Sequence, residues 1–234
     1  MQNSVGRLFK MRQPRQRTAA GRLVLALERH RIDCVIDVGG NEGQTGSALL
    51  KAGWAGRIVS FEPVAAAHRD LERAASRAGN WTVAPRMALG AENGEIEINV
   101  GLTHNWSSIR AVRDETVRIR PKSRTVAREC VPLRRLDGVL TDFAAPKDRL
   151  FVKIDTQGYE GEILAGAAGA MDRIHGFQLE LCLAPLYESE ETYERFFAWM
   201  GERGFELWMV ESASFSAELA RQTHFDAIFF RRSG

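Results

Sequence analysis

The sequence predicts an α/β fold whose core is an open, mostly parallel sheet of about seven strands. Short apolar runs that end at Gly or Pro alternate with segments of helical character, which is the pattern of repeated strand–helix units. The 234 residues, 44% hydrophobic and 26% charged, can bury the core of one such domain without a metal or a disulfide. A glycine-rich turn directly after the first strand adds a feature typical of ligand-binding sheets.

The composition also excludes several classes of protein. A net charge of +2 provides no global field for nucleic acid. Cys34, Cys130 and Cys182 lie far apart and cannot all pair, so we expect reduced thiols and no structural zinc site. No stretch reaches the roughly 18 apolar residues that a membrane span needs, and the first residues lack the apolar core of a secretory signal. We therefore expect a cytoplasmic protein without a membrane span.

The chain is expected to begin with a basic arm and one helix, over residues 1–31. This segment carries eight Lys and Arg side chains against a single acid, Glu28. Thr18 can cap the helix, and the leucines that follow it supply an apolar face. The remaining residues, 32–234, are expected to form one domain.

Strands and helices then alternate along this domain. Most predicted strands are short runs rich in Val, Ile and Phe, and turns that contain Gly or Pro follow several of them. The expected strands are 32–38, 57–62, 81–84, 87–89, 95–100, 125–131, 150–155, 174–183, 205–210 and 225–230. The expected helices are 44–52, 64–78, 160–171 and 190–203.

Residues 101–125 interrupt the alternation and are expected to form an inserted loop or lid, because long irregular segments in compact domains are usually functional. Within this segment, Trp106 and Ser107 offer an aromatic surface and a hydroxyl group, which suits a polar, sugar-like ligand. His104 is a candidate general base because an imidazole titrates near neutral pH. A plain surface turn, with Trp106 packed on the sheet, is the alternative.

The most informative motif follows the first predicted strand and is Asp37-Val38-Gly39-Gly40-Asn41-Glu42-Gly43. Gly39 and Gly43 allow a tight turn and a close approach of the backbone to a ligand before a helix begins. Glu62 lies 19 residues beyond Gly43, at the end of the next strand, where a carboxylate can accept hydrogen bonds from both ribose hydroxyls. The two features predict a nucleoside-type cofactor at the carboxyl ends of the strands.

The same turn distinguishes between cofactors. A dinucleotide site requires glycine at the positions that Asn41 and Gln44 occupy. Asp37 would also be unfavourable beside a pyrophosphate, whereas it suits the sulfonium and ammonium groups of S-adenosylmethionine. The residues therefore favour S-adenosylmethionine over NAD, and an ordinary strand–helix turn is the alternative.

A second motif also places a strand end, a glycine turn and a helix start in succession, and it is Lys153-Ile154-Asp155-Thr156-Gln157-Gly158-Tyr159-Glu160. Asp155 is expected to project over the same crevice, where it could orient an acceptor, take its proton or hold the methionine amine. A helix cap is the alternative role. Glu180, on the following strand, could face the crevice as a further catalytic acid.

With these motifs the sequence resembles the FkbM-like family of S-adenosylmethionine-dependent methyltransferases, from about Val35 to Leu183. The resemblance rests on the order and spacing of residues 35–43, Phe61-Glu62-Pro63, Ala88-Leu89-Gly90, Leu136-Asp137 and 153–160. It implies a Rossmann-like class I methyltransferase sheet of about seven strands, with the last strand, near 225–230, antiparallel. It also implies methylation of a hydroxyl on a small polar metabolite, such as a sugar, a glycoside or a polyketide-type product.

The resemblance implies cofactor roles for Asp37, Gly39, Asn41, Glu62 and Ala88, and the motifs themselves supply the other candidate residues. The expected cofactor contacts are Asp37, Gly39, Gly40, Asn41, Gly43, Glu62, Pro63, Ala88 and Asp155, with Ala88 near the adenine. The expected catalytic residues are Asp155, His104 and Glu180. The expected substrate contacts are Trp106, Ser107 and Gln157.

Two departures from the family pattern concern the acceptor rather than the cofactor. Gln157 stands where glutamate is usual, and Thr156 stands where valine is common. If that glutamate is a base or a metal ligand in relatives, this chain cannot use it in the same way. We therefore predict no metal, although Asp155 and Glu180 are oxygen ligands of the kind that hard cations prefer.

The basic segments leave two other functions open. The N-terminal arm and the nine Lys and Arg residues among 110–135 could attract an anionic acceptor or RNA, while a solvated charged face is the simpler interpretation. The turn after Asp155 lacks the prolines of enzymes that methylate base amino groups, so we expect no nucleic-acid partner. Ribose methylation of RNA and a non-catalytic cofactor-binding module are the alternatives.

Overall fold

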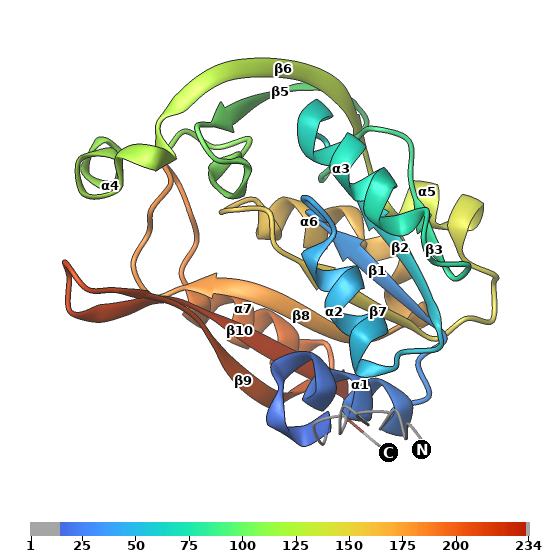
Figure 1. Ribbon diagram of the computed structural model, residues 1–234. Coiled ribbons are helices and arrows are strands. Elements are labelled where there is room, and N and C mark those ends of the chain that lie inside the picture. Colours follow the sequence, from blue (N-terminus) through green and yellow to red (C-terminus); the bar gives the residue numbers. More distant parts are fainter. Residues whose placement is uncertain (1–14, 233–234) are drawn as a thin grey trace, which may run out of the picture.

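The computed structural model describes residues 15–232, and its centre is a seven-stranded sheet (Figure 1). Its strands lie in the order β3-β2-β1-β7-β8-β10-β9. They are β1 (Cys34–Val38), β2 (Arg57–Phe61), β3 (Trp81–Val83), β7 (Leu150–Ile154), β8 (Ile174–Cys182), β9 (Phe205–Ser216) and β10 (Arg221–Arg231). Five strands pair in parallel, and β10 is antiparallel to both β8 and β9. This confirms the predicted sheet with a reversed last strand.

Helices cover both faces of this sheet (Figure 1). The helices are α1 (Ala19–Arg29), α2 (Gln44–Ala52) and α3 (Ala65–Ala75) on one face, and α5 (Leu136–Phe143), α6 (Glu160–Gly166) and α7 (Tyr193–Glu202) on the other. Leucines of α1, α2 and α3 share an apolar cluster with Phe151 and Phe230. Apolar side chains of α5, α6 and α7 share another with Val152 and Phe177. The alternating faces of the central strands therefore hold two cores.

The first helix confirms one prediction at its amino end. The side-chain oxygen of Thr18 accepts a hydrogen bond from the backbone N–H of Gly21 at 3.0 Å, which satisfies one free donor of the first turn. A short 3₁₀ turn, η1 (Arg15–Arg17), precedes the helix. The part of the predicted basic arm before Arg15 lies outside the described residues.

A second, three-stranded sheet arches over the carboxyl ends of the central strands (Figure 1). Its strands are β4 (Ala88–Leu89), β5 (Gly94–Gly101) and β6 (Thr125–Arg134). The segment between β5 and β6, predicted as a loop, contains the short helices η2 (His104–Trp106), α4 (Asp114–Ile119) and η3 (Pro121–Ser123). The sequence predicted each of these strands, but it did not predict that they form a sheet separate from the central one.

The ends of β1, β2 and β7 meet at the point where the strand order reverses, which is where open α/β sheets bind ligands. The backbone N–H groups of Gly39 and Gly40 both donate to the carbonyl of Phe61 at 3.0 Å. Gly39 has a φ of +80°, and a Cβ there would lie 2.0 Å from the carbonyl oxygen of Asp155. Glycine is therefore required where the two turns cross.

Two further features complete the description. A 3₁₀ turn, η4 (Ala168–Arg173), continues the helical segment after α6. None of the helices in the described part of the chain is both long and apolar enough to cross a membrane.

Candidate active site

A cavity of about 350 Å³ opens at the carboxyl ends of β1, β2 and β7, beneath the arch of the small sheet. This volume lies within the range of roughly 300–1,000 Å³ that is usual for small-molecule sites. Eleven predicted site residues line it: Gly39, Gly40, Asn41, Glu62, Pro63, Ala88, His104, Ser107, Asp155, Gln157 and Glu180. Gly39 and Glu180, which are 141 positions apart in the sequence, are thus brought into one site.

Three predicted site residues do not line this cavity: Asp37, Gly43 and Trp106. A Cβ on Gly43 would lie 2.9 Å from the ring of Trp81, so that glycine permits close packing between helices and sheet. The ring of Trp106 lies 6.4 Å from that of Tyr187. Ligand contacts of these three residues remain predictions.

The turn after β1 presents an unpaired acceptor. Asn41 has a φ of +46°, and its backbone N–H donates to Oε2 of Glu62 at 2.9 Å. Its side-chain Oδ1 is shielded from solvent and has no hydrogen-bond partner among the described residues. A buried acceptor without a donor is unfavourable, so a ligand that donates a hydrogen bond here would complete the site.

Glu62 closes the same side of the cavity and is 6% exposed. Its Oε1 accepts a hydrogen bond from the backbone of Val64 at 2.8 Å, and its Oε2 accepts the one from Asn41. Burial raises the pKa of Glu62 to about 7, although the two backbone hydrogen bonds oppose this shift. Ligand hydroxyls that donate to the carboxylate would favour its ionised form.

A buried ion pair adjoins the cavity, which Lys153 and Asp155 both line. Nζ of Lys153, on β7, is 3.5 Å from Oδ1 of Asp37 and 3.2 Å from Oδ2 of Asp155. The side chain of Asp37 is fully buried, and its Oδ2 accepts a hydrogen bond from Ser60 at 2.9 Å. Burial lowers the pKa of Lys153, but the two carboxylates outweigh it and hold the pKa above its ordinary value. The lysine is therefore a cation at neutral pH.

Gln157 joins two acids across the cavity. Its Nε2 donates to Oδ1 of Asp155 at 3.0 Å and to Oε2 of Glu180 at 2.7 Å. Burial raises the pKa of Asp155, but Lys153 and the hydrogen bond from Gln157 outweigh it and hold the pKa below its ordinary value. Burial and the nearby charge of Asp155 hold the pKa of Glu180 well above its ordinary value. The two neighbouring acids therefore have pKa values shifted in opposite directions.

Two residues of this network were not predicted from the sequence. Lys153 lies within a predicted motif but was given no role of its own. A lysine inside an apolar strand is nevertheless a sign of a buried partner. Tyr187, which is 1% exposed, donates a hydrogen bond from its hydroxyl to Oε1 of Gln157 at 2.9 Å. Nothing in the sequence near Tyr187 indicates this contact, because it joins residues 30 positions apart.

His104 and Ser107 enter the cavity from the segment between β5 and β6. Nδ1 of His104 lies 3.7 Å from Oε1 of Glu42 and has no hydrogen-bond partner among the described residues. The hydroxyl of Ser107 accepts a hydrogen bond from the backbone of Gly101 at 3.1 Å, which holds the segment against β5. Both side chains therefore stand on the wall opposite the central sheet.

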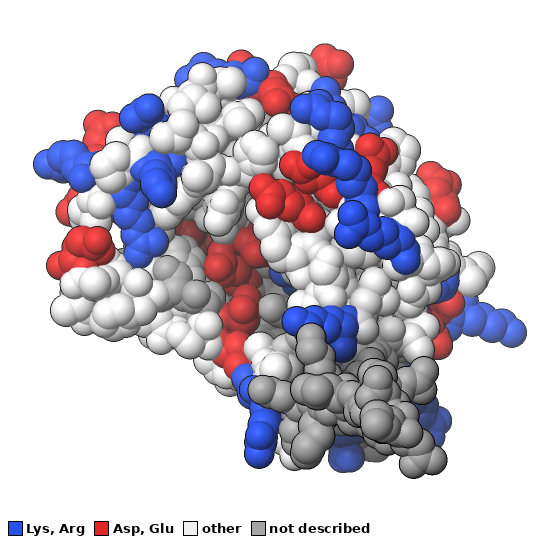
Figure 2. Space-filling model, in the orientation of Figure 1, with Lys and Arg blue, Asp and Glu red and all other residues white. Residues whose placement is uncertain are grey.

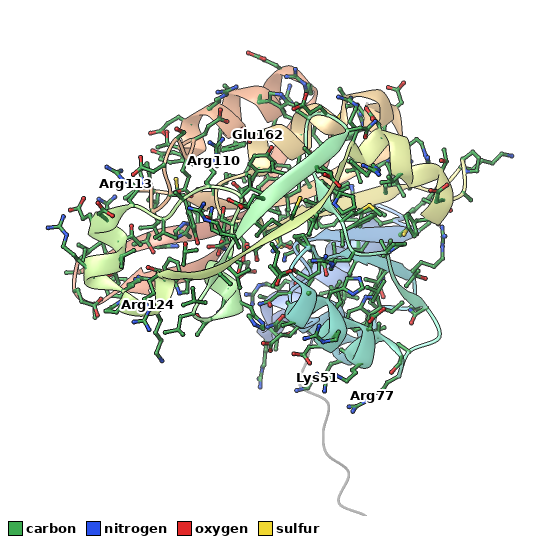
Figure 3. The ribbon with its side chains drawn as sticks, turned by 90° about the horizontal axis from the view of Figure 1, so that it is seen from above. Lys51, Arg77, Arg110, Arg113, Arg124 and Glu162 are labelled. Atoms are coloured by element: carbon green, nitrogen blue, oxygen red, sulfur yellow. The ribbon has the colours of Figure 1, made fainter. Side chains whose placement is uncertain are left out.

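Several arginines of the basic segment pair with acids. Arg110 donates to Glu162 at 2.6 Å, and the two side chains lie side by side in Figure 3. Arg128 lies 3.1 Å from Glu97, and Arg113 lies 4.0 Å from Glu188. These pairs offset part of the positive charge that the sequence places between 110 and 135.

The cavity itself is acidic. Glu62, Asp155 and Glu180 line it, whereas Lys153 is the single Lys or Arg among its described lining residues. Figure 2 shows acidic side chains in the hollow between the arch and the central sheet. This excess of carboxyl groups favours a cationic ligand. Among residues 15–232, no group of three or more His, Cys, Asp or Glu side chains is placed to hold a metal ion.

Comparisons with known proteins agree with this geometry. Residues 37–207 match the model of the methyltransferase FkbM domain. The magnesium protoporphyrin IX methyltransferase of Synechocystis PCC 6803, solved with bound S-adenosylmethionine, is 10% identical, with 98% of this chain and 87% of that chain covered and a TM-score of 0.50. An O-methyltransferase from Bacillus cereus, solved with S-adenosylhomocysteine, is also 10% identical, with coverages of 91% and 80% and a TM-score of 0.50.

A candidate RNA methyltransferase from Pyrococcus horikoshii is 14% identical, with coverages of 92% and 84% and a TM-score of 0.49. Proteins with curated descriptions yield no match to this chain. At 10% identity, the two likenesses with a TM-score of 0.50 show a shared fold.

Replacing Lys153 by methionine tests the buried ion pair. The variant leaves Asp37 buried without its cation, so we expect the free energy of unfolding to fall by about 3–5 kcal/mol. Urea denaturation followed by circular dichroism measures this change. Lys51→Met, at the exposed end of α2 (Figure 3), should change stability by less than about 0.5 kcal/mol. Adding Asp37→Asn to Lys153→Met should restore part of the lost stability. Equal stability of Lys153→Met and the wild type would contradict the assignment of a buried ion pair.

The raised pKa of Glu62 makes stability depend on pH. The folded state binds this proton more tightly than the unfolded state, whose pKa is near 4.5. The resulting stabilisation is complete below pH 4.5 and is lost as the pH rises through about 7. The stability difference between wild type and Glu62→Gln should therefore shift by up to about 3 kcal/mol between pH 4.5 and 8. Urea titrations at several pH values measure it, and a pH-independent difference would be the contrary result.

Proposed function

The chain belongs to the FkbM family of S-adenosylmethionine-dependent methyltransferases, and from this premise we propose that it methylates a hydroxyl oxygen of a small polar acceptor. Sugars, glycosides and polyketide-type products are the acceptor classes that we favour. The observation that carries this proposal is the pairing of Asp155 with Glu180 across Gln157, in a cavity that also contains the cofactor turn.

The residues present suit the cofactor. The unpaired Oδ1 of Asn41 can accept a hydrogen bond, and Glu62 at the end of β2 can accept the ribose hydroxyls. The closely crossed turns at Gly39 leave backbone, and no side chain, beside the ligand. Ala88 and Leu89 of β4 provide apolar walls for an adenine. The acidic cavity balances the positive charge of the methionine part.

S-adenosylmethionine supplies a methyl group on a positively charged sulfur, which an oxygen nucleophile can attack without further activation of the donor. The protein has to hold the acceptor in line and to receive its proton. Asp155 is ionised beside Lys153 and faces the cavity, so it can accept the hydroxyl proton as the new C–O bond forms. Burial and the nearby charge of Asp155 raise the pKa of Glu180, and in its protonated form it can donate a hydrogen bond to a second polar group of the acceptor. A diol or a sugar provides such a pair of groups.

The wall formed by the segment between β5 and β6 completes the acceptor side. Ser107 and His104 present a hydroxyl and an imidazole toward the cavity, which Gln157 also lines. His104 is the alternative base, since its Nδ1 has no hydrogen-bond partner within the described chain. We assign acceptor binding to these three residues, with Trp106 behind the wall against Tyr187.

Titration calorimetry tests the cofactor site. Glu62→Gln keeps the shape of the side chain and removes its charge, so we expect S-adenosylmethionine to bind about tenfold or more weakly. Glu72→Gln, exposed on α3, is the matched control and should bind like the wild type. Equal affinity of Glu62→Gln and the wild type would show that Glu62 does not hold the cofactor. Binding of NAD in place of S-adenosylmethionine would contradict the whole assignment.

An acceptor panel tests the reaction. Purified protein and S-adenosylmethionine are incubated with monosaccharides, glycosides, polyketide-type hydroxyl compounds and short RNAs, and release of S-adenosylhomocysteine is measured. We expect an O-methyl product from the small molecules, identified by mass and NMR spectroscopy. Asp155→Asn should lower kcat by about 100-fold or more. Methylation of RNA ribose alone would favour the first alternative, and cofactor binding with no product would favour a non-catalytic module.

A further inference from the structure

We propose that Tyr187 is a positioning residue whose hydroxyl fixes the side-chain amide of Gln157 so that both of its N–H groups face Asp155 and Glu180. The inference rests on the proposed function, because it concerns the acids of the same acceptor site. It adds an explanation of how the chain can function with the side-chain amide of Gln157 between Asp155 and Glu180.

The amide of Gln157 is fully used in this arrangement. A glutamine side chain has one donor end, with two N–H groups, and one acceptor end. The donor end is shared between Asp155 at 3.0 Å and Glu180 at 2.7 Å. The acceptor end, Oε1, receives the hydroxyl of Tyr187 at 2.9 Å. Rotating the amide by half a turn would place a carbonyl oxygen against the ionised Asp155, which can only accept hydrogen bonds.

Tyr187 is the group that satisfies Oε1 while the N–H groups face the acids. Without its hydroxyl, the half-buried carbonyl oxygen would lose its donor, and the orientation that serves both acids would lose its support. Phenylalanine at this position would fill the same space and could not donate. The hydroxyl group, rather than the ring, therefore carries the proposed role.

The backbone of each partner is held by contacts with neighbouring segments. Gln157 has a φ of +58°, and its carbonyl accepts a hydrogen bond from the hydroxyl of Ser108 at 2.7 Å. The backbone of Tyr187 forms a bridge with Val112 and donates to Oε2 of Glu190 at 3.1 Å. The segments on either side of the cavity thus hold the tyrosine and the glutamine at a fixed separation.

Charged groups on several elements face this network. Those nearest the two acids are Lys153 of β7, Glu160 of α6 and Asp226 of β10, and those nearest Tyr187 are Glu160, Glu180, Glu190 and Asp155. Burial, followed by the surrounding carboxylates, holds the pKa of Tyr187 well above its ordinary value. The tyrosine therefore keeps its proton, and remains a donor, throughout the range in which the acids titrate.

The orientation of the Gln157 amide should affect the pKa values of Asp155 and Glu180. Hydrogen bonds donated to a carboxylate stabilise its charged form and lower its pKa. An amide that no longer presents both N–H groups would withdraw this stabilisation from Asp155 and Glu180 together. Loss of the Tyr187 hydroxyl should therefore raise the pKa of both acids, whereas a change in packing alone would have no such directional effect.

The experiment is a ¹³C NMR titration of the side-chain carboxyl groups in the full chain labelled at Asp and Glu. Signals are assigned with Glu180→Gln and Asp155→Asn. In Tyr187→Phe we expect the titration midpoints of both acids to move upward by about one pH unit. Tyr193→Phe, on α7 and away from the cavity, is the matched control and should leave the midpoints unchanged.

A double-mutant cycle separates positioning from packing. Gln157→Met removes the amide and should itself raise both midpoints, which keeps the proposal testable if Tyr187→Phe does not fold. Adding Tyr187→Phe to Gln157→Met should produce no further shift. Equal shifts from Tyr187→Phe in both backgrounds, or a shift in neither, would overturn the proposal. The titration needs no acceptor, so failure of methyl transfer on every acceptor would leave this result standing.

Discussion

The site is organised around one buried cation. Lys153 lies between Asp37, which is fully buried on β1, and Asp155, which faces the cavity. A carboxylate without a counter-ion would be strongly disfavoured at the position of Asp37, so the lysine ties the centre of the sheet to its functional edge. The charge of the same cation lowers the pKa of Asp155, whereas burial and the nearby Asp155 hold the pKa of Glu180 well above its ordinary value. The contrast between the two acids therefore depends in part on a residue that belongs to the core.

Much of this architecture could be predicted because it is encoded locally. The apolar runs at 32–38 and 150–155 and the glycine turn after Asp37 follow directly from short-range chemistry. Parallel strands end at one edge of the sheet, so the motifs around Glu62 and Asp155 had to meet there. Eight of the eleven predicted lining residues belong to or follow β1, β2, β7 and β8 and reach the cavity for this reason, whereas Ala88, His104 and Ser107 reach it from the small sheet and its inserted segment. Their individual roles toward cofactor and acceptor stay predictions.

What the sequence could not supply depends on long-range contacts. Tyr187 meets Gln157 only because two strands and their turns converge, and an aromatic residue in a sequence is more often part of a core. The small sheet was missed as a unit because each of its strands looks ordinary, and pairing between β5 and β6 spans an irregular insertion. The strands β9 and β10 extend beyond the predicted 205–210 and 225–230, because polar residues near their hairpin hide the strand pattern.

The arch formed by β5 and β6 has a consequence for how such a protein can diversify. The cofactor turn and Asp155 belong to the central sheet, whereas His104 and Ser107 belong to a separate sheet and the segment inserted into it. Substitutions and length changes between β5 and β6 can remodel one wall of the cavity without disturbing the strands that carry the residues predicted to hold the cofactor. Natural variation in that segment would let paralogues acquire new acceptors while inheriting the same donor chemistry.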